Sequence, residues 1–227
     1  LTYTMADLLV TLKRPAEAAR RYLQLYSDWP DRPLATAAAV QAGNLYFELE
    51  RYADAYQAFA PVLKLEPDET THARAVLALF RDARTAEAER ATKKFRKQFG
   101  RKSSWLELFQ LEEAQYLLAA ESFDAALKIF REVAAGGGPW QAEAAYFEAT
   151  TQWQQHQAAP TEESGPRALQ AQIRFVQSFP ASPRIFAVHW RLGNHHYGLR
   201  AYLLAAAAYK RILEGSAGKV LKAQAIW

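Results

Sequence analysis

One eighteen-residue pattern occurs twice in this chain, and it limits what the chain can fold into. The first copy is Ala42–Phe59 and the second is Leu192–Tyr209. Both contain Gly-Asn, then an aromatic residue, Leu, Tyr, and two alanines with an aromatic residue after the second, at the same offsets. Each copy is typical of a helix, a sharp turn and a second helix. A chain that repeats such a unit is expected to stack helix pairs, because one pair cannot bury its apolar face alone.

The second helix of every unit can be followed by an alanine with a partner four residues later on the same face. Successive marker alanines lie 33 to 42 residues apart. Four of the six partners are aromatic, so the third and fifth units are degenerate. The six pairs are Ala18 and Tyr22, Ala55 and Phe59, Ala88 and Thr92, Ala126 and Phe130, Ala168 and Gln172, and Ala205 and Tyr209.

Proline and glycine mark the ends of these units, because proline restricts the preceding residue and cannot donate to a helix. Together with the apolar spacing, these stops predict six helix pairs. The predicted pairs are 2–13 with 15–29, 34–50 with 52–65, 69–83 with 85–99, 103–120 with 122–135, 140–157 with 165–179, and 184–199 with 201–214. A further helix is expected to start near 218 and to be cut short, which suggests a piece of a longer protein.

Composition agrees with an all-α fold. Half of the 227 residues are apolar, glycine and proline number 10 each, and there is no cysteine. The lack of cysteine removes disulfides, thiolate metal sites and cysteine nucleophiles, and it fits the cytosol and an oxidising compartment equally well. No uninterrupted apolar run reaches the roughly 18 residues of a membrane-spanning helix.

The repeated residues resemble those of the tetratricopeptide-repeat (TPR) family. The unit from Thr36 to Glu69 matches the family pattern at Ala42-Gly43, Tyr46, Tyr52, Ala55, Phe59 and Pro67. The unit around 186–214 matches nearly as well, whereas residues 156–166 form an insertion. The resemblance implies one domain over residues 1–227, a right-handed α-solenoid that acts as a non-catalytic scaffold or adaptor for a protein partner.

The resemblance also implies a binding surface, because first helices line the concave groove in this family. A peptide or helix would lie there, with Asn side chains bonding to its backbone and aromatic side chains acting as anchors. The alternative is that these side chains only pack within the stack. The predicted groove residues are Val40, Asn44, Phe47, Leu77, Phe80, Leu111, Gln115, Leu118, Trp190, Asn194 and Tyr197.

Residues 84–102 form a basic segment, with eight basic side chains against two acidic ones in a chain of net charge +4. Five of them are expected on one exposed stripe of the second helix of the third unit, with Ala88, Phe95 and Phe99 turned inward. The stripe predicts, as an alternative function, a regulatory module that binds nucleic acid or an anionic surface. The absence of interleaved exposed aromatics argues against nucleic acid. The basic stripe comprises Arg90, Lys93, Lys94, Lys97 and Arg101.

Neither catalytic nor metal chemistry is predicted. The chain has no Gly-x-Ser-x-Gly elbow, phosphate-binding glycine loop or His-Glu-x-x-His. His189 and His196 are about 10 Å apart along a helix, too far to chelate one ion. We therefore expect no enzyme activity, cofactor or metal.

A narrower resemblance concerns the compartment. The segment from Phe175 to Pro183, leading into Trp190-Arg191-Leu192-Gly193, is similar to linkers of TPR proteins in the bacterial cell envelope. Those proteins assist outer-membrane assembly or cell-wall enzymes. The resemblance implies the periplasm or cell envelope, with the cytoplasm as the alternative.

Overall fold

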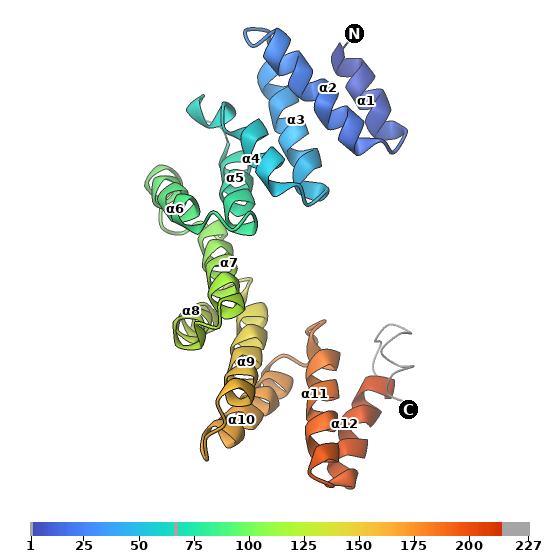
Figure 1. Cartoon of the computed structure of the whole chain (residues 1–227), viewed down its shortest axis with the longest axis vertical. Helices are drawn as coiled ribbons and strands as arrows, with labels where there is room; N and C mark the ends of the chain where they lie inside the picture. Colours follow the sequence, from blue (N-terminus) through green and yellow to red (C-terminus); the bar gives the residue numbers. More distant parts are fainter. Residues whose placement is uncertain (1, 66–67, 215–227) are drawn as a thin grey trace. The chain divides into compact units, whose positions relative to one another are not determined.

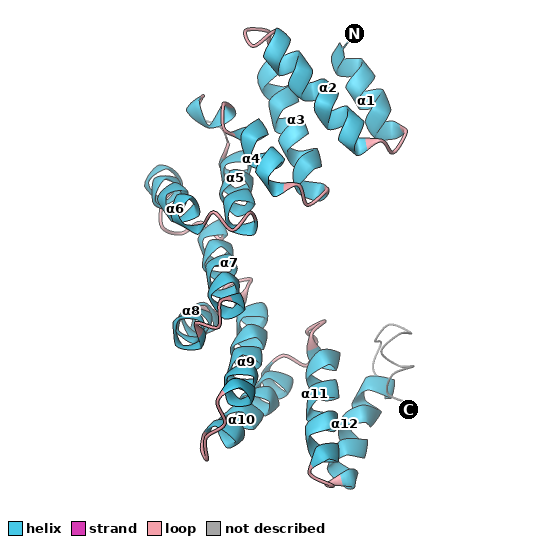
Figure 2. Ribbon diagram, in the orientation of Figure 1, coloured by secondary structure: helices cyan, strands magenta, loops and turns pink. Residues whose placement is uncertain are grey.

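The computed structural model describes residues 2–65 and 68–214, and within these ranges the chain forms helices and loops but no strand (Figure 2). The chain divides into two compact units, the first ending at Tyr116 and the second beginning at Leu117. The boundary lies within α7 (Trp105–Ala119). The prediction of a single domain over the whole chain stays a prediction.

The first unit begins with three helix pairs and a short 3-10 turn (Figure 1). Their bounds are α1 (Thr2–Thr11), α2 (Pro15–Asp28), α3 (Ala35–Glu48), α4 (Tyr52–Phe59), η1 (Val62–Lys64), α5 (Glu69–Arg81) and α6 (Thr85–Phe99). The second unit contains α8 (Phe123–Ala135), α9 (Gln141–Ala158), α10 (Ser164–Ser178), α11 (Ile185–Gly198) and α12 (Tyr202–Glu214).

The predicted all-α fold of helix pairs is confirmed, with one notable error of length. The second helix of the second unit was expected over 52–65, but α4 ends at Phe59. Pro61 explains the difference, because its ring clashes with the preceding helical turn and it lacks the N–H that would continue the ladder. The chain resumes only as η1. The helix expected near 218 lies outside the described residues.

The marker alanines give the stack its spacing. All six are buried, and so are Tyr22, Phe59 and Phe130 four residues after three of them. At the degenerate fifth position, Gln172 is buried as well and donates to the carbonyl oxygen of Ala149 at 2.7 Å. The hydrogen bond satisfies a polar side chain in a place that an aromatic ring fills elsewhere.

Five helix pairs share a left-handed turn at a residue that is not glycine. In these five pairs, the second residue after the end of the first helix has a φ of 56° to 59°, at Lys13, Glu50, Ala83, Glu121 and Arg200. In each case its N–H and the next one donate to carbonyls of the last helical turn, for example Glu50 to Phe47 and Arg51 to Tyr46. This is the Schellman arrangement, which satisfies the free carbonyls at a helix end.

The fifth pair departs from this pattern where the insertion was predicted. α9 runs on to Ala158, and residues 159–163 connect it to α10. The Ser164 hydroxyl accepts from the Thr161 N–H at 2.8 Å and lies 2.7 Å from Nδ1 of His156. The insertion is therefore a longer first helix followed by a hydrogen-bonded turn.

Candidate partner-binding site

The predicted groove residues of α3 lie on its partly exposed face. Val40, Asn44 and Phe47 are all half-buried. The Asn44 Oδ1 accepts from an Nη1–H of Arg74 on α5 at 2.7 Å, which leaves its amide NH₂ without a partner among the described residues. Phe47 meets Tyr52 edge to face, with ring centroids 5.3 Å apart. α3 and α5 are thus joined by a hydrogen bond beside an aromatic pair.

A pocket of about 450 Å³ opens beside these residues, within the first unit. It has three aromatic side chains, two arginines and two glutamates on its walls. The lining residues are Phe47, Glu48, Glu50, Tyr52, Arg74, Leu77, Arg81 and Trp105. They come from α3, the turn after it (Glu50), the start of α4, α5 and α7, so first helices supply most of the surface.

Arg81 is held at the edge of this pocket by α7 and by aromatic rings. Its Nε and Nη2 donate to one oxygen of Glu112, at 2.9 and 2.7 Å. The guanidinium carbon lies 5.0 Å from the ring centroid of Phe47. Burial by itself would lower the pKa of Arg81, but the bonds to Glu112 outweigh it and raise the pKa above its ordinary value. Arg81 is therefore a fixed positive charge in the pocket wall.

Three predicted groove residues lie in the core instead. Leu77, Phe80 and Leu111 are 4%, 5% and 1% exposed. Phe80 stacks on Phe109 at 6.3 Å, and both belong to the cluster that also holds Leu77. The third unit has Thr92 where four other units have an aromatic ring, and Leu77 and Phe80 lie in its core. A partner cannot reach them while the stack is intact, although an edge of Leu77 borders the pocket.

The remaining predicted residues differ in availability. Gln115 and Leu118 on α7 are half-buried. In the second unit, Trp190 is half-buried against Tyr209, at 5.5 Å between ring centroids. Asn194 is exposed and accepts from the Tyr209 hydroxyl at 2.7 Å. Tyr197 is 61% exposed and meets Tyr202 edge to face. None of these residues lines the pocket of the first unit.

Sequence reasoning missed the arginines, although they repeat. Arg74 and Arg191 each stand fourteen residues before a marker alanine. Each reaches the preceding first helix, Arg74 at Asn44 and Arg191 at Thr150, with 3.2 Å between its Nη1 and the threonine hydroxyl. A search for polar residues at equivalent repeat positions would have found this pair.

Four residues of the basic stripe lie on α6, whereas Arg101 was predicted on the same helix but follows its C-cap, Gly100. Arg90, Lys93, Lys94, Lys97 and Arg101 are all exposed, while Ala88 and Phe95 are fully buried. None of the five forms an ion pair with any residue that the structure describes. Arg84, at the start of the same segment, is instead paired with Glu87 at 2.6 Å. The stripe is a solvated run of positive charge.

The histidines do not form a metal site within the described part of the chain. No group of three or more His, Asp or Glu side chains there is arranged to hold an ion. His195 lies 5.5 Å from His196 and 5.3 Å from Trp153, centroid to centroid. Burial, with His196 and His156 nearby, lowers the pKa of His195. None of the described helices is both long and apolar enough to cross a membrane.

Comparison with known proteins identifies the fold. No protein-family model matches the chain, and no curated protein matches it by sequence. Among solved structures, a monomeric mutant of IFIT1 with m7Gppp-AAAA is similar, with a TM-score of 0.53 and 13% identity. That similarity covers 93% of this chain but only 48% of the other, so the chain spans about half of its length.

The C-terminal part of a TPR repeat-containing protein from Cytophaga hutchinsonii is also similar. Its TM-score is 0.44 with 13% identity, covering 97% of this chain and 98% of the other. The fold is an all-α solenoid of TPR-like helix pairs.

Proposed function

We propose that this protein is a non-catalytic scaffold that binds a peptide or helix of a partner protein at the α3–α5–α7 pocket. The observation that supports this is the pocket itself, where Phe47, Tyr52 and Trp105 stand beside Arg74 and Arg81. Aromatic residues and arginine are the types that contribute most of the energy at protein interfaces. A volume of about 450 Å³ accommodates an anchoring side chain with part of its backbone.

Polar groups in the pocket and beside it suit the backbone of a bound segment. Arg74 holds the Oδ1 of Asn44, so the amide NH₂ of Asn44 is left to donate to a peptide carbonyl. The two arginines are balanced by Glu48 and Glu50 on the same walls. A balanced lining favours a partner that supplies an apolar anchor and hydrogen bonds over a partner of strong net charge.

Affinity capture from the source organism, with wild-type and variant protein compared by quantitative mass spectrometry, tests this proposal. Asn44→Ala and Arg74→Ala should each weaken a captured partner's binding about tenfold in calorimetry, because each removes a part-buried polar group that positions or binds the partner. Arg21→Ala, on the exposed face of α2, is the matched control. Loss of the partner with Asn194→Ala or Trp190→Ala, but not with the α3 and α5 variants, would place the site in the second unit and reject the pocket.

A second candidate function rests on the basic stripe, whose five exposed cations lack ion-pair partners among the described residues. The stripe supports a regulatory module that binds an anionic surface or nucleic acid. Binding to anionic vesicles or to an oligonucleotide should fall steeply with salt and disappear when Lys93, Lys94 and Lys97 are changed to Glu. Lys210→Glu on α12 is the control. Binding unaffected by the triple reversal rules this function out.

We also propose that the protein works in a bacterial envelope assembly, in the periplasm or at the cell envelope. The support is the resemblance of the segment around Pro180 and Pro183 to linkers of envelope TPR proteins. Fractionation of the source organism with an antibody against the chain tests it. Recovery in the cytoplasmic fraction alone would contradict this location without affecting the pocket.

A further inference from the structure

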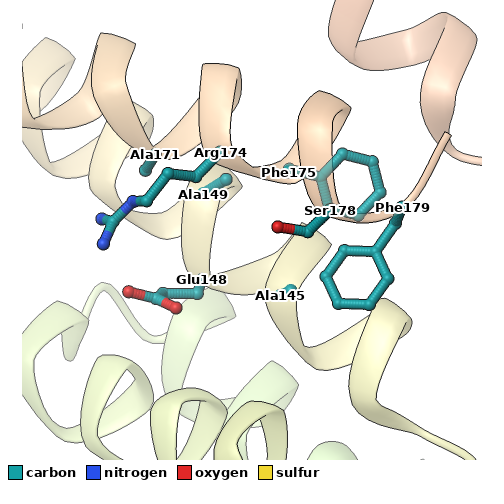
Figure 3. Close-up of a pocket in the computed structure, with 8 residues that line it drawn as sticks. All are labelled: Ala145, Glu148, Ala149, Ala171, Arg174, Phe175, Ser178 and Phe179. Atoms are coloured by element: carbon teal, nitrogen blue, oxygen red, sulfur yellow. The ribbon is translucent and has the colours of Figure 1, made fainter.

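Two hollows of different chemistry adjoin each other on the second unit, between α8, α9 and α10. The smaller has a volume of about 130 Å³ (Figure 3). The larger has about 430 Å³ and is lined by Arg131, Glu148, Gln152, Arg167, Gln170 and Arg174. Glu148 and Arg174 belong to both. The hollows therefore form one continuous surface, which we call the α8–α10 trough.

The smaller hollow is apolar at its base. Ala145 and Ala149 of α9 face Ala171 of α10, and these small side chains leave a space that the rings of Phe175 and Phe179 close at one end (Figure 3). The two rings lie 5.6 Å apart. An apolar cavity of about 150 Å³ holds a benzene molecule. The smaller hollow is therefore suited to one aliphatic side chain, with the Ser178 hydroxyl at its border.

The larger hollow is cationic, with three guanidinium groups against one carboxylate. One oxygen of Glu148 accepts from both Arg131 Nε at 3.1 Å and Gln152 Nε2 at 2.9 Å. Arg167 pairs with Glu163 on the exposed side. Arg174 has no hydrogen bond or ion pair to any described residue, and it extends from α10 toward Glu148 where the two hollows meet (Figure 3). It is the arginine free to bind a ligand.

We propose that the α8–α10 trough binds an acidic protein segment that carries one aliphatic residue among its carboxylates. Guanidinium groups bind carboxylates through paired hydrogen bonds, so Arg174 would hold one acidic side chain. Arg167 would hold a second by exchanging its solvent-exposed pair with Glu163 for the ligand. The aliphatic side chain would enter the hollow beside Phe175. From Arg167 to Ser178 the trough runs about 16 Å along α10, which about five extended residues span.

The lining favours a peptide over a single-stranded nucleic acid. Binding of single strands depends on exposed aromatic faces on which bases stack. Phe175 is buried, and Phe179 is half-buried against it. The trough lies in the second unit, so it is independent of the α3–α5–α7 pocket and can be tested without it.

Three synthetic heptapeptides test the proposal on the full chain by calorimetry. The first is Glu-Asp-Glu-Leu-Glu-Asp-Glu, which is symmetric and so fits either chain direction. The second replaces every acidic residue with its amide, and the third replaces Leu with Ser. The first should bind at least about tenfold more tightly than the other two, since each of them loses either the charge-assisted bonds or the apolar anchor.

Variants then locate the binding. Arg174→Glu should weaken the first peptide about tenfold or more. Ser178→Trp, which fills the border of the small hollow, should remove the advantage of Leu over Ser. Lys128→Glu changes the charge by the same amount at an exposed residue of α8 that does not line the trough. It should leave binding of the first peptide unchanged. Circular dichroism verifies that each variant keeps its helices.

Three results would overturn the proposal. The first is equal binding of the acidic and amide peptides, or binding of neither at millimolar concentration. The second is an equal loss with Lys128→Glu and Arg174→Glu, which would mean diffuse attraction. The third is an oligothymidylate that displaces the peptide and depends on Arg174 in the same way, because the trough would then be a nucleic-acid site.

Discussion

A methyl group at position 43 would collide with the ring of Phe59. A Cβ built there lies 2.5 Å from Phe59 Cε1, and Phe59 is fully buried, so the ring cannot move aside. Overpacking of this kind costs about 1–3 kcal/mol, offset by about 1 kcal/mol from the better helix propensity of alanine. We expect Gly43→Ala to lower the free energy of unfolding by up to about 2 kcal/mol in urea titrations.

Gly193 provides the matched comparison, because its Cβ would lie 2.3 Å from Tyr209 Cε1. Tyr209 is only half-buried, so its ring can swing outward at the expense of its hydrogen bond to Asn194. Gly193→Ala should therefore cost less than Gly43→Ala. Equal losses in the two variants would contradict the idea that burial of the facing ring determines the cost.

His72 makes the stability of the chain dependent on pH. It is 1% exposed, its Nδ1 has no hydrogen-bond partner, and it meets Phe95 and Phe99 edge to face. Burial, with Lys94 nearby, lowers the pKa of His72. In the unfolded chain a histidine titrates near pH 6.5. Below that pH the unfolded state binds a proton that the folded state excludes, so stability falls as the pH falls.

We expect the free energy of unfolding to decrease between pH 7.5 and pH 5.5, and to decrease less in His72→Leu. Denaturant titrations at the two pH values measure both differences. His189 and His195 also have lowered pKa values, through burial, and should leave some pH dependence in the variant. An unchanged pH dependence in His72→Leu would show that His72 is not a source of it.

Among the elements, the turns between the two helices of a pair contain backbone strain, because a residue other than glycine adopts a positive φ there. A left-handed conformation costs a residue other than glycine about 1 kcal/mol or more. Ala83, with a φ of 56°, is exposed and offers no side-chain hydrogen bond in return. Ala83→Gly should therefore stabilise the protein. Glycine relieves the strain in the folded state but also gives the unfolded chain more conformational entropy, so the net gain in the free energy of unfolding is about 0.5–1 kcal/mol.

The same substitution inside a helix should have the opposite sign. Ala86 is exposed near the start of α6, and Ala86→Gly should destabilise by up to about 1 kcal/mol. Thermal unfolding of the two variants side by side measures both effects. If both substitutions lower the melting temperature, the turn at Ala83 stores no strain that glycine can relieve.

These elements also show what the sequence could predict. Helix pairs follow from the alanine spacing and from the proline stops, since both act through local geometry. The early end of α4 at Phe59 could also have been predicted, from Pro61. The five left-handed turns were not predictable, because Lys13, Glu50, Ala83, Glu121 and Arg200 share no residue type that favours a positive φ. Their conformation follows from the packing of the two helices that they join.

At the scale of the whole molecule, the site was harder to predict than the fold. Equivalent repeat positions were assumed to face the same way, which holds for Asn44 and Tyr197 but not for Leu77, Phe80 or Leu111. These three side chains of α5 and α7 are buried in the core, and repeat periodicity alone did not distinguish them from exposed residues. Surface contacts between helices, such as that of Arg74 with Asn44, depend on neighbours that no periodicity specifies.

The division of the chain at α7 leads to a last prediction, about how far a defect spreads. Phe95 is fully buried in the first unit and lies 5.1 Å from Phe109, ring to ring. Phe95→Ala should remove about 3–5 kcal/mol from its surroundings. Because each repeat in a solenoid depends mainly on its neighbours, hydrogen exchange should quicken in α5 and α6 and stay unchanged in α11 and α12.

Phe175→Ala is the reciprocal variant, since Phe175 is buried in a cluster of the second unit with Val188 and Leu192. It should quicken exchange in α10 and α11 and spare α2 and α3. If either substitution accelerates exchange evenly along the chain, the two units unfold together, and the single domain predicted from the sequence describes the energetics better than the two compact units do. If exchange becomes faster only near the substituted residue in both variants, each unit is a separate cooperative unit. Each can then unfold locally at its own binding surface while the other stays folded.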